Sequence, residues 1–143
     1  MPTIVLETKI HATGDTCLDL IRDERVHSGP KPAIFGDLGL GQTITFKSAF
    51  VGTSQKLTVK VVEFDRSRLL VDEMIAGNFR SFKHIHEFTK TENGTLMRDT
   101  LIWTSPFGFF GKIVDKLLLE RHLTRLVLTR NAKLKKIAES AIS

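Results

Sequence analysis

Residues 79–104 read FRSFKHIHEFTKTENGTLMRDTLIWT. Apolar and polar residues alternate on both sides of the dipeptide Asn93-Gly94, which is the strongest short-range signal for a two-residue β-hairpin turn. The sequence therefore predicts two antiparallel strands joined at this dipeptide. With that turn, the expected cross-strand pairs are Lys90 with Met97, Phe88 with Asp99, His86 with Leu101, and His84 with Trp103.

One face of this hairpin is largely apolar but carries three polar side chains. Because side chains alternate between the two faces of a strand, the residues on this face are Phe82, His84, His86, Phe88, Met97, Asp99, Leu101 and Trp103. The other face carries Ser81, Lys83, Glu87, Arg98 and Thr100 and is expected to face water. Asp99 is expected to be the diagonal neighbour of His86. The two histidines and Asp99 therefore point inward, where each needs a hydrogen-bond partner.

The rest of the chain predicts an α+β domain. Period-two alternation predicts a strand over residues 3–10 and three more within 42–51, 55–65 and 68–77. A short helix is expected over about 15–24, a long loop over 28–41 and a long C-terminal helix over about 111–141. This order predicts one domain, residues 1–143, in which an antiparallel sheet of about six strands packs on the last helix.

The apolar pattern of the last helix changes phase near Leu118. Ile113, Val114, Leu117 and Leu118 share one side, whereas the residues from Leu119 onward form a stripe on roughly the opposite side. We therefore expect either a fully buried first turn or a bend near Leu118. Arg130 falls within the second stripe, so its guanidinium is expected either to pair with Asp99 or to reach the edge of the helix.

Composition and charge exclude several classes of protein. No apolar run approaches the roughly 20 residues of a membrane span, and the first residues do not resemble a secretory signal. The single cysteine, Cys17, fits a reducing compartment and is expected to be a small buried hydrophobe. These features predict a soluble, cytoplasmic protein, with its oligomeric state, monomer or homodimer, left open.

The net charge of +5 comes from one segment. Residues 112–136 contain eight lysines and arginines against two acidic residues. A solvated helix face explains this excess, and a surface that docks an acidic partner is the alternative. No aromatic residues interleave with the basic ones, which disfavours nucleic acid as that partner.

The inward polar residues of the hairpin allow four interpretations. His84, His86 and Asp99 could supply a two-histidine, one-carboxylate metal site, although we expect no metal and no cofactor. His86 and Asp99 could instead perform acid–base catalysis in a dry pocket. The same face could bind a small apolar molecule without chemistry. Finally, the histidines could be hydrogen-bonded residues of a filled core.

The sequence resembles the START-like SRPBCC superfamily, which has the pollen-allergen-like helix-grip fold. Within it, the sequence is most similar to small bacterial members described as ligand-binding or polyketide cyclase/dehydrase-like proteins. The matching positions are Gly77 and Phe79, then His84, His86 and Phe88, then Gly94, Thr95 and Asp99, and last Pro106 and Gly108. The chain departs from the pattern in having no tyrosine, so Trp103 stands where many members carry an aromatic hydroxyl.

The resemblance implies a sheet curled around the last helix, with a cavity between them that takes a lipophilic ligand. We therefore expect a protein that binds an apolar or amphipathic small molecule, lipid-like or polyketide-like. The expected lining residues are Phe82, His84, His86, Phe88, Met97, Asp99, Leu101, Trp103 and Arg130. One alternative is a cyclase or dehydratase that uses His86 and Asp99, and another is an interaction protein that acts through its basic C-terminal helix.

Overall fold

A computed structural model describes residues 2–27, 31–50, 53–105 and 110–140. The predictions that involve residues 28–30, 51–52, Pro106, Gly108 and Ala141 lie outside these ranges. The strands are β1 (Thr3–Ile10), β2 (Ala33–Phe35), β3 (Thr43–Phe50), β4 (Thr53–Asp65), β5 (Leu69–Gly77), β6 (Ser81–Thr91) and β7 (Gly94–Thr104). The helical segments are α1 (Gly14–Leu20), η1 (Glu24–Val26), α2 (Gly111–Val114), η3 (Asp115–Leu119) and α3 (Glu120–Ser140).

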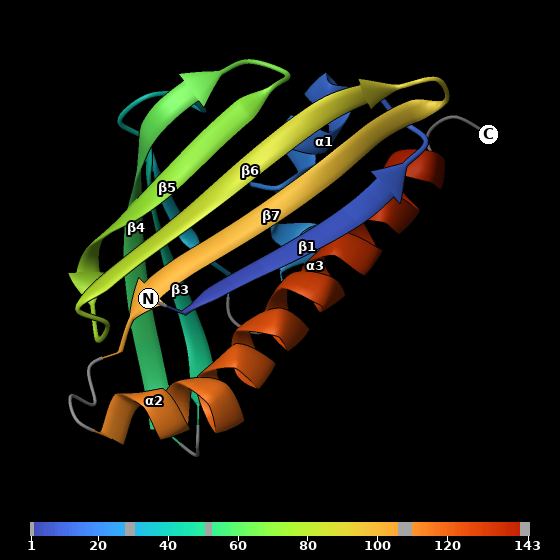
Figure 1. Cartoon of the computed structure of the whole chain (residues 1–143). Coiled ribbons are helices and arrows are strands. Elements are labelled where there is room, and N and C mark those ends of the chain that lie inside the picture. The colour runs from blue at the N-terminus through green and yellow to red at the C-terminus, as the bar shows by residue number, and fades with distance from the viewer. Residues whose placement is uncertain (1, 28–30, 51–52, 106–109, 141–143) are drawn as a thin grey trace.

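The strands form one antiparallel sheet in the order β1-β7-β6-β5-β4-β3-β2. The sheet is strongly curved, and α3 runs along its open side, with α1 near one end of the sheet and α2 near the other (Figure 1). This arrangement confirms the predicted α+β helix-grip fold. The described sheet has seven strands rather than about six, because β2 lies inside the predicted loop over 28–41.

The faces of the β6–β7 hairpin were predicted correctly, but its register was not. Thr91 pairs with Gly94, so the turn is Glu92-Asn93, and Asn93 lacks the positive φ that the predicted turn required. Every cross-strand pair is therefore shifted by two residues. His86 lies directly opposite Asp99 rather than opposite Leu101, and His84 lies opposite Leu101 rather than Trp103. A shift of two preserves the faces because side chains alternate with a period of two.

Gly94 begins β7 where the chain has no space for a side chain. A Cβ at this position would collide with the backbone of β1 and the residue after it, chiefly the carbonyl oxygen of Ile10 and Cα of His11. The close contact between β7 and β1 at this point therefore requires glycine.

We expect Gly94→Ala to destabilise the fold more than Gly39→Ala. Both glycines have a positive φ, 159° and 147°, but a Cβ at Gly39 would meet nothing within 4 Å. The difference between the two variants isolates the steric cost, which should be about 1–3 kcal/mol of unfolding free energy. Urea unfolding of both variants measures this difference. Equal losses of unfolding free energy would show that the backbone of β1 moves away from a side chain at residue 94 at little cost.

The C-terminal helix contains the predicted phase change. Five residues, Asp115–Leu119, form a π-helical segment between α2 and α3, and a π-helical turn takes one more residue than an α-helical turn. The extra residue rotates the apolar face. Ile113, Leu117 and Leu118 are exposed, whereas Leu119 and Leu123 are buried, so the expectation of a fully buried first turn is wrong. Within the described residues, no helix has the length and apolar character of a membrane span.

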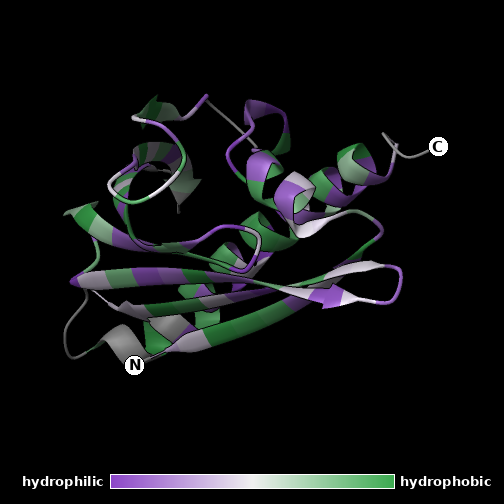
Figure 2. Ribbon diagram, turned by 90° about the horizontal axis from the view of Figure 1, so that it is seen from above, coloured by the Kyte–Doolittle hydropathy of each residue, from purple (hydrophilic) through white to green (hydrophobic). Residues whose placement is uncertain are grey.

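The interior has two apolar clusters with a polar layer between them. One cluster, near α1, contains Phe88 of β6 and Met97 of β7. The other, near α2, contains Phe82 and Leu101 of the same two strands. Hydrophilic and hydrophobic residues alternate along these strands (Figure 2). The inward residues between the clusters are His84, His86 and Asp99, so the polar side chains of the hairpin form a layer across the core.

Candidate functional site

The carboxylate of Asp99 lies at the centre of the polar layer. Its side chain is 0% exposed. Its Oδ1 accepts a hydrogen bond from Arg130 Nη2 at 2.6 Å, and His84 Nε2 lies 2.8 Å from the same oxygen. Its Oδ2 accepts a hydrogen bond from Asn131 Nδ2 at 2.8 Å. The guanidinium of Arg130 therefore pairs with Asp99, which is one of the two positions expected from the sequence, and does not extend to the helix edge.

A second buried carboxylate, Asp72 on β5, was missed by the sequence analysis. Asp72 lies opposite His84 in the β5–β6 ladder, and its Oδ2 lies 3.2 Å from His86 Nε2. Its Oδ1 pairs with the guanidinium of Arg22, which follows α1. Asp72 shares its face of β5 with the buried Leu70, because residues two positions apart along a strand lie on the same face.

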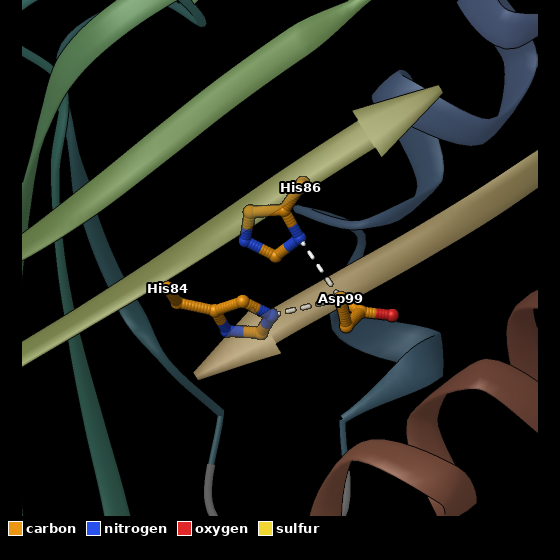
Figure 3. A group of neighbouring side chains, drawn as sticks. All are labelled: His84, His86 and Asp99. Carbon is orange, nitrogen blue, oxygen red and sulfur yellow. Dashed lines mark hydrogen bonds and ion pairs between the residues drawn. The ribbon is translucent and has the colours of Figure 1, made fainter. Parts of the chain in front are cut away.

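His86 lies between the two carboxylates. Its side chain is 1% exposed, and its Nδ1 lies 3.2 Å from Asp99 Oδ1, though without the alignment of a hydrogen bond. The rings of His84 and His86 stack, with centroids 3.8 Å apart and planes at 23°. Figure 3 shows both rings projecting from β6 toward Asp99 on β7. The result is a chain of buried groups that runs Arg22, Asp72, His86, Asp99, Arg130.

These groups shift one another's protonation equilibria. Burial would raise the pKa of Asp72, but the hydrogen bond with His86 and the charge of Arg22 outweigh burial and hold that pKa well below its usual range. Burial likewise opposes ionisation of Asp99, but Arg130 and the two histidines hold its pKa low. Burial, followed by the nearby His86, lowers the pKa of His84 to about 3. At neutral pH both carboxylates are therefore ionised and His84 is neutral.

The donor atoms of His84, His86 and Asp99 lie within 4.8 Å of one another, a spacing that a metal ion could span. However, Asp99 Oδ1 already accepts a bond from a guanidinium, and its Oδ2 accepts a bond from Asn131. A divalent cation at this position would meet the positive charge of Arg130 and would have to displace these bonds. The three side chains therefore fit a metal poorly.

A cavity of about 770 Å³ lies between the sheet and the C-terminal helix. Its polar end contains Arg22, His27, Asp72, His84, His86 and Arg130, and its apolar wall includes Phe46, Leu57, Val59, Phe82, Leu101, Leu119, Leu123 and Val127. The volume falls within the roughly 300–1,000 Å³ typical of small-molecule sites, and a mostly apolar lining with a few convergent polar groups is their usual composition.

Of the nine residues expected to bind a ligand, five line this cavity: Phe82, His84, His86, Leu101 and Arg130. The other four, Phe88, Met97, Asp99 and Trp103, are not among its lining residues and are at most 5% exposed. Asp99 therefore influences the cavity only by positioning lining side chains such as His84 and Arg130. Direct contact with a ligand stays a prediction for the five lining residues.

His27 and Cys17 were not among the nine residues expected to bind a ligand, and the structure shows where each lies. His27 lines the cavity, and its ring contacts that of Phe46 at a centroid distance of 5.2 Å. Burial, followed by the charge of Arg130, lowers the pKa of His27 to about 4. Cys17 is 0% exposed, and burial raises the pKa of its thiol to about 11, which agrees with the prediction of a small buried hydrophobe.

Three exposed basic residues of the C-terminal helix, unlike Arg130, lie outside this polar layer. Lys116, Arg121 and Arg125 line a separate groove of about 560 Å³, together with Glu120, Thr124, Leu128 and Thr129. Lys116, Arg121 and Arg125 are exposed, as expected for a solvated helix face. A partner for this face stays a prediction.

Several solved structures have this fold. A crystal structure of TTHA0849 from Thermus thermophilus matches 99% of this chain and 100% of its own, with a TM-score of 0.83 and 17% identity. The di-domain ARO/CYC StfQ from the steffimycin biosynthetic pathway matches 98% of this chain and 51% of its own, at TM-score 0.80 and 14% identity. Norcoclaurine synthase from Thalictrum flavum matches 95% of this chain and 85% of its own, at TM-score 0.67 and 15% identity.

No protein-family model and no curated protein matches the chain by sequence. At identities of 17% or less, the structural likenesses establish the fold alone. That fold is the helix-grip fold, as the sequence predicted.

Proposed function

We propose that residues 1–143 form a single ligand-binding domain that takes up an apolar or amphipathic small molecule, lipid-like or polyketide-like, between the sheet and the C-terminal helix. The cavity of about 770 Å³ is the observation that carries this proposal. A filled core would leave no such space, because protein interiors are close-packed. The buried free thiol of Cys17 fits a reducing compartment, so we place the protein in the cytoplasm.

The lining combines the charged groups around His84 and His86 with a broad apolar surface, which supports an amphipathic ligand. Phe46, Leu57 and Leu101 offer apolar surface, and each square ångström of apolar surface removed from water contributes about 25 cal/mol. The charged end would fix the orientation of the ligand. Fixed buried groups also limit the cost of reorganisation on binding.

We expect the neutral fluorescent probe N-phenyl-1-naphthylamine to bind saturably, and Leu57→Trp to weaken its binding at least about tenfold. Leu57 lines the cavity and is half-buried, so a larger ring there occupies the space of the ligand. Fluorescence titration measures the affinity. Val62→Trp is the matched control, because Val62 is exposed and does not line the cavity. Equal affinities of the two variants would contradict binding in this cavity.

A second candidate function is acid–base catalysis on the bound molecule, of the cyclase or dehydratase type. The observation that favours it is His86, which lines the cavity while each of its ring nitrogens lies 3.2 Å from a carboxylate oxygen. An imidazole held between two carboxylates is positioned to exchange a proton with a ligand. In this reading Asp99 is a positioning residue, since it does not line the cavity.

Ligand binding and catalysis predict different outcomes for a small molecule that co-purifies with the protein. We expect native mass spectrometry to detect a bound small molecule whose mass is unchanged after incubation with fresh protein. If the bound molecule instead loses one water, the protein is an enzyme, provided that His86→Phe abolishes this reaction but still binds the molecule with the same affinity.

A further inference from the structure

His84 has one ring nitrogen engaged and one available. Because Asp99 is ionised, its oxygens only accept hydrogen bonds, so the Nε2 that lies 2.8 Å from Oδ1 carries the hydrogen. The ring is neutral, which leaves a lone pair on Nδ1. Among the described residues, nothing donates a hydrogen bond to Nδ1, and Figure 3 shows this second nitrogen turned away from Asp99. A lining side chain of the cavity thus presents a hydrogen-bond acceptor.

Two buried arginines line the same end of the cavity and keep donors available. Arg22 uses Nε on Gln42 and Nη2 on Asp72, and Arg130 uses Nε and Nη2 on Asn131 and Nη2 on Asp99. In the part of the chain that the structure describes, neither Nη1 has a hydrogen-bond partner. The polar end therefore combines N–H donors with one acceptor.

The charges at this end are already balanced. Arg22 is paired with Asp72 and Arg130 with Asp99, so these four groups sum to zero. The two ring nitrogens of His86 lie 3.2 Å from oxygens of these same two carboxylates. A ligand anion at this end would have to compete with Asp72 and Asp99 for guanidinium groups that are already paired, which is costly. A cationic amine could donate to His84 Nδ1 but would face two guanidinium groups.

We propose that the cavity selects molecules whose polar end is a neutral hydroxyl, an alcohol or a phenol, which donates its proton to His84 Nδ1 and accepts from Arg22 or Arg130. A hydroxyl suits this site because it has one donor and two acceptor positions. A carboxylate has no proton to give, and its lone pairs would face that of Nδ1. The inference rests on the proposed function, since it names the class of ligand for the same cavity.

The test is a titration at pH 7 with four molecules that share one apolar skeleton: pyrene, 1-hydroxypyrene, 1-pyrenecarboxylate and 1-pyrenemethylamine. Quenching of the single tryptophan, Trp103, gives the dissociation constants. We expect 1-hydroxypyrene to bind about 3- to 10-fold more tightly than pyrene, the gain of a neutral buried hydrogen bond. We expect it to bind at least about tenfold more tightly than either charged analogue, since buried unpaired charge costs more.

His84→Phe keeps a ring at this position but removes the acceptor, so 1-hydroxypyrene should then bind no better than pyrene. His11→Phe, the same change at an exposed histidine that does not line the cavity, should leave the preference intact. The inference would be overturned, while the proposed function stands, if the unmodified protein bound all four molecules with equal affinity or bound 1-pyrenecarboxylate most tightly. Failure of all four molecules to saturate would overturn the proposed function itself.

Discussion

Asp99→Asn is expected to lower the free energy of unfolding by about 3–5 kcal/mol, because removing one partner of a buried ion pair leaves the other charge uncompensated. Arg130 is that partner, buried on α3 with its Nη2 2.6 Å from Asp99 Oδ1. The amide keeps the size of the side chain but replaces an acceptor with a donor among the donors of His84, Arg130 and Asn131. Urea unfolding at pH 7 measures the loss.

The matched control is Glu7→Gln, which makes the same chemical change in an exposed pair. Glu7 accepts from Arg98 at 2.9 Å, and both side chains are 47% exposed, so solvent screens the interaction and the change should be small. The double variant Asp99→Leu with Arg130→Met should recover part of the loss, since it removes both charges. If Asp99→Asn were no more costly than Glu7→Gln, the polar layer would not have the buried, paired character described above.

Acidification is expected to destabilise the protein steeply between pH 6.5 and pH 4. His84 and His27 have folded-state pKa values of about 3 and about 4, below the ordinary value of 6.5. The unfolded chain therefore takes up protons first as the pH falls through 6.5, which favours unfolding. Each histidine contributes a slope of up to about 1.4 kcal/mol per pH unit, and the loss continues until the pH reaches its folded-state pKa.

Below about pH 4 the carboxylates add to this loss. The pKa values of Asp72 and Asp99 are held low in the folded state, so the stability that these carboxylates provide is present above their unfolded pKa and disappears as the pH falls further. Urea unfolding at several pH values measures the profile. His84→Phe should reduce the slope between pH 6.5 and pH 4. A flat profile in that interval would contradict the neutral, buried state of these imidazoles.

The inward orientation of the hairpin residues could be predicted because it depends only on alternation. Placing the turn at Asn93-Gly94 shifted every pair by two residues, yet His84, His86 and Asp99 stayed on the inner face. The observed register places Gly94 against the end of β1, which lies more than 80 residues earlier in the sequence and leaves no space for a side chain there. Local turn chemistry could not reveal that contact.

Asp72 and Arg22, the other buried ion pair of the polar layer, were missed for a related reason. Asp72 stands in a strand, RLLVDEMIAG, in which apolar residues occupy both faces, so no clean alternation marks its direction. Its partner Arg22 comes from the segment after α1, 50 residues away, and only the fold brings the two together. By contrast, Arg130 stood out in an apolar helical stripe, and its pairing with Asp99 was one of two expected outcomes.

The shape of the C-terminal helix was predicted in part. The phase change near Leu118 was visible as two apolar faces, and the structure accounts for it with the π-helical segment Asp115–Leu119. The strand β2 was not visible, because its three residues lie in a segment rich in glycine and proline and are all exposed. Short edge strands of this kind depend on pairing with a neighbour, here β3, rather than on their own pattern.

The most direct test of the account is where a neutral apolar molecule contacts the protein. Nuclear Overhauser effects between bound N-phenyl-1-naphthylamine and the methyl groups of the protein locate it. We expect contacts with Leu57, Leu101 and Val127, which line the cavity. Contacts confined to the exposed side chains of Ile113 and Leu117, with none to Leu101, would place the probe on the surface and contradict the cavity as the binding site.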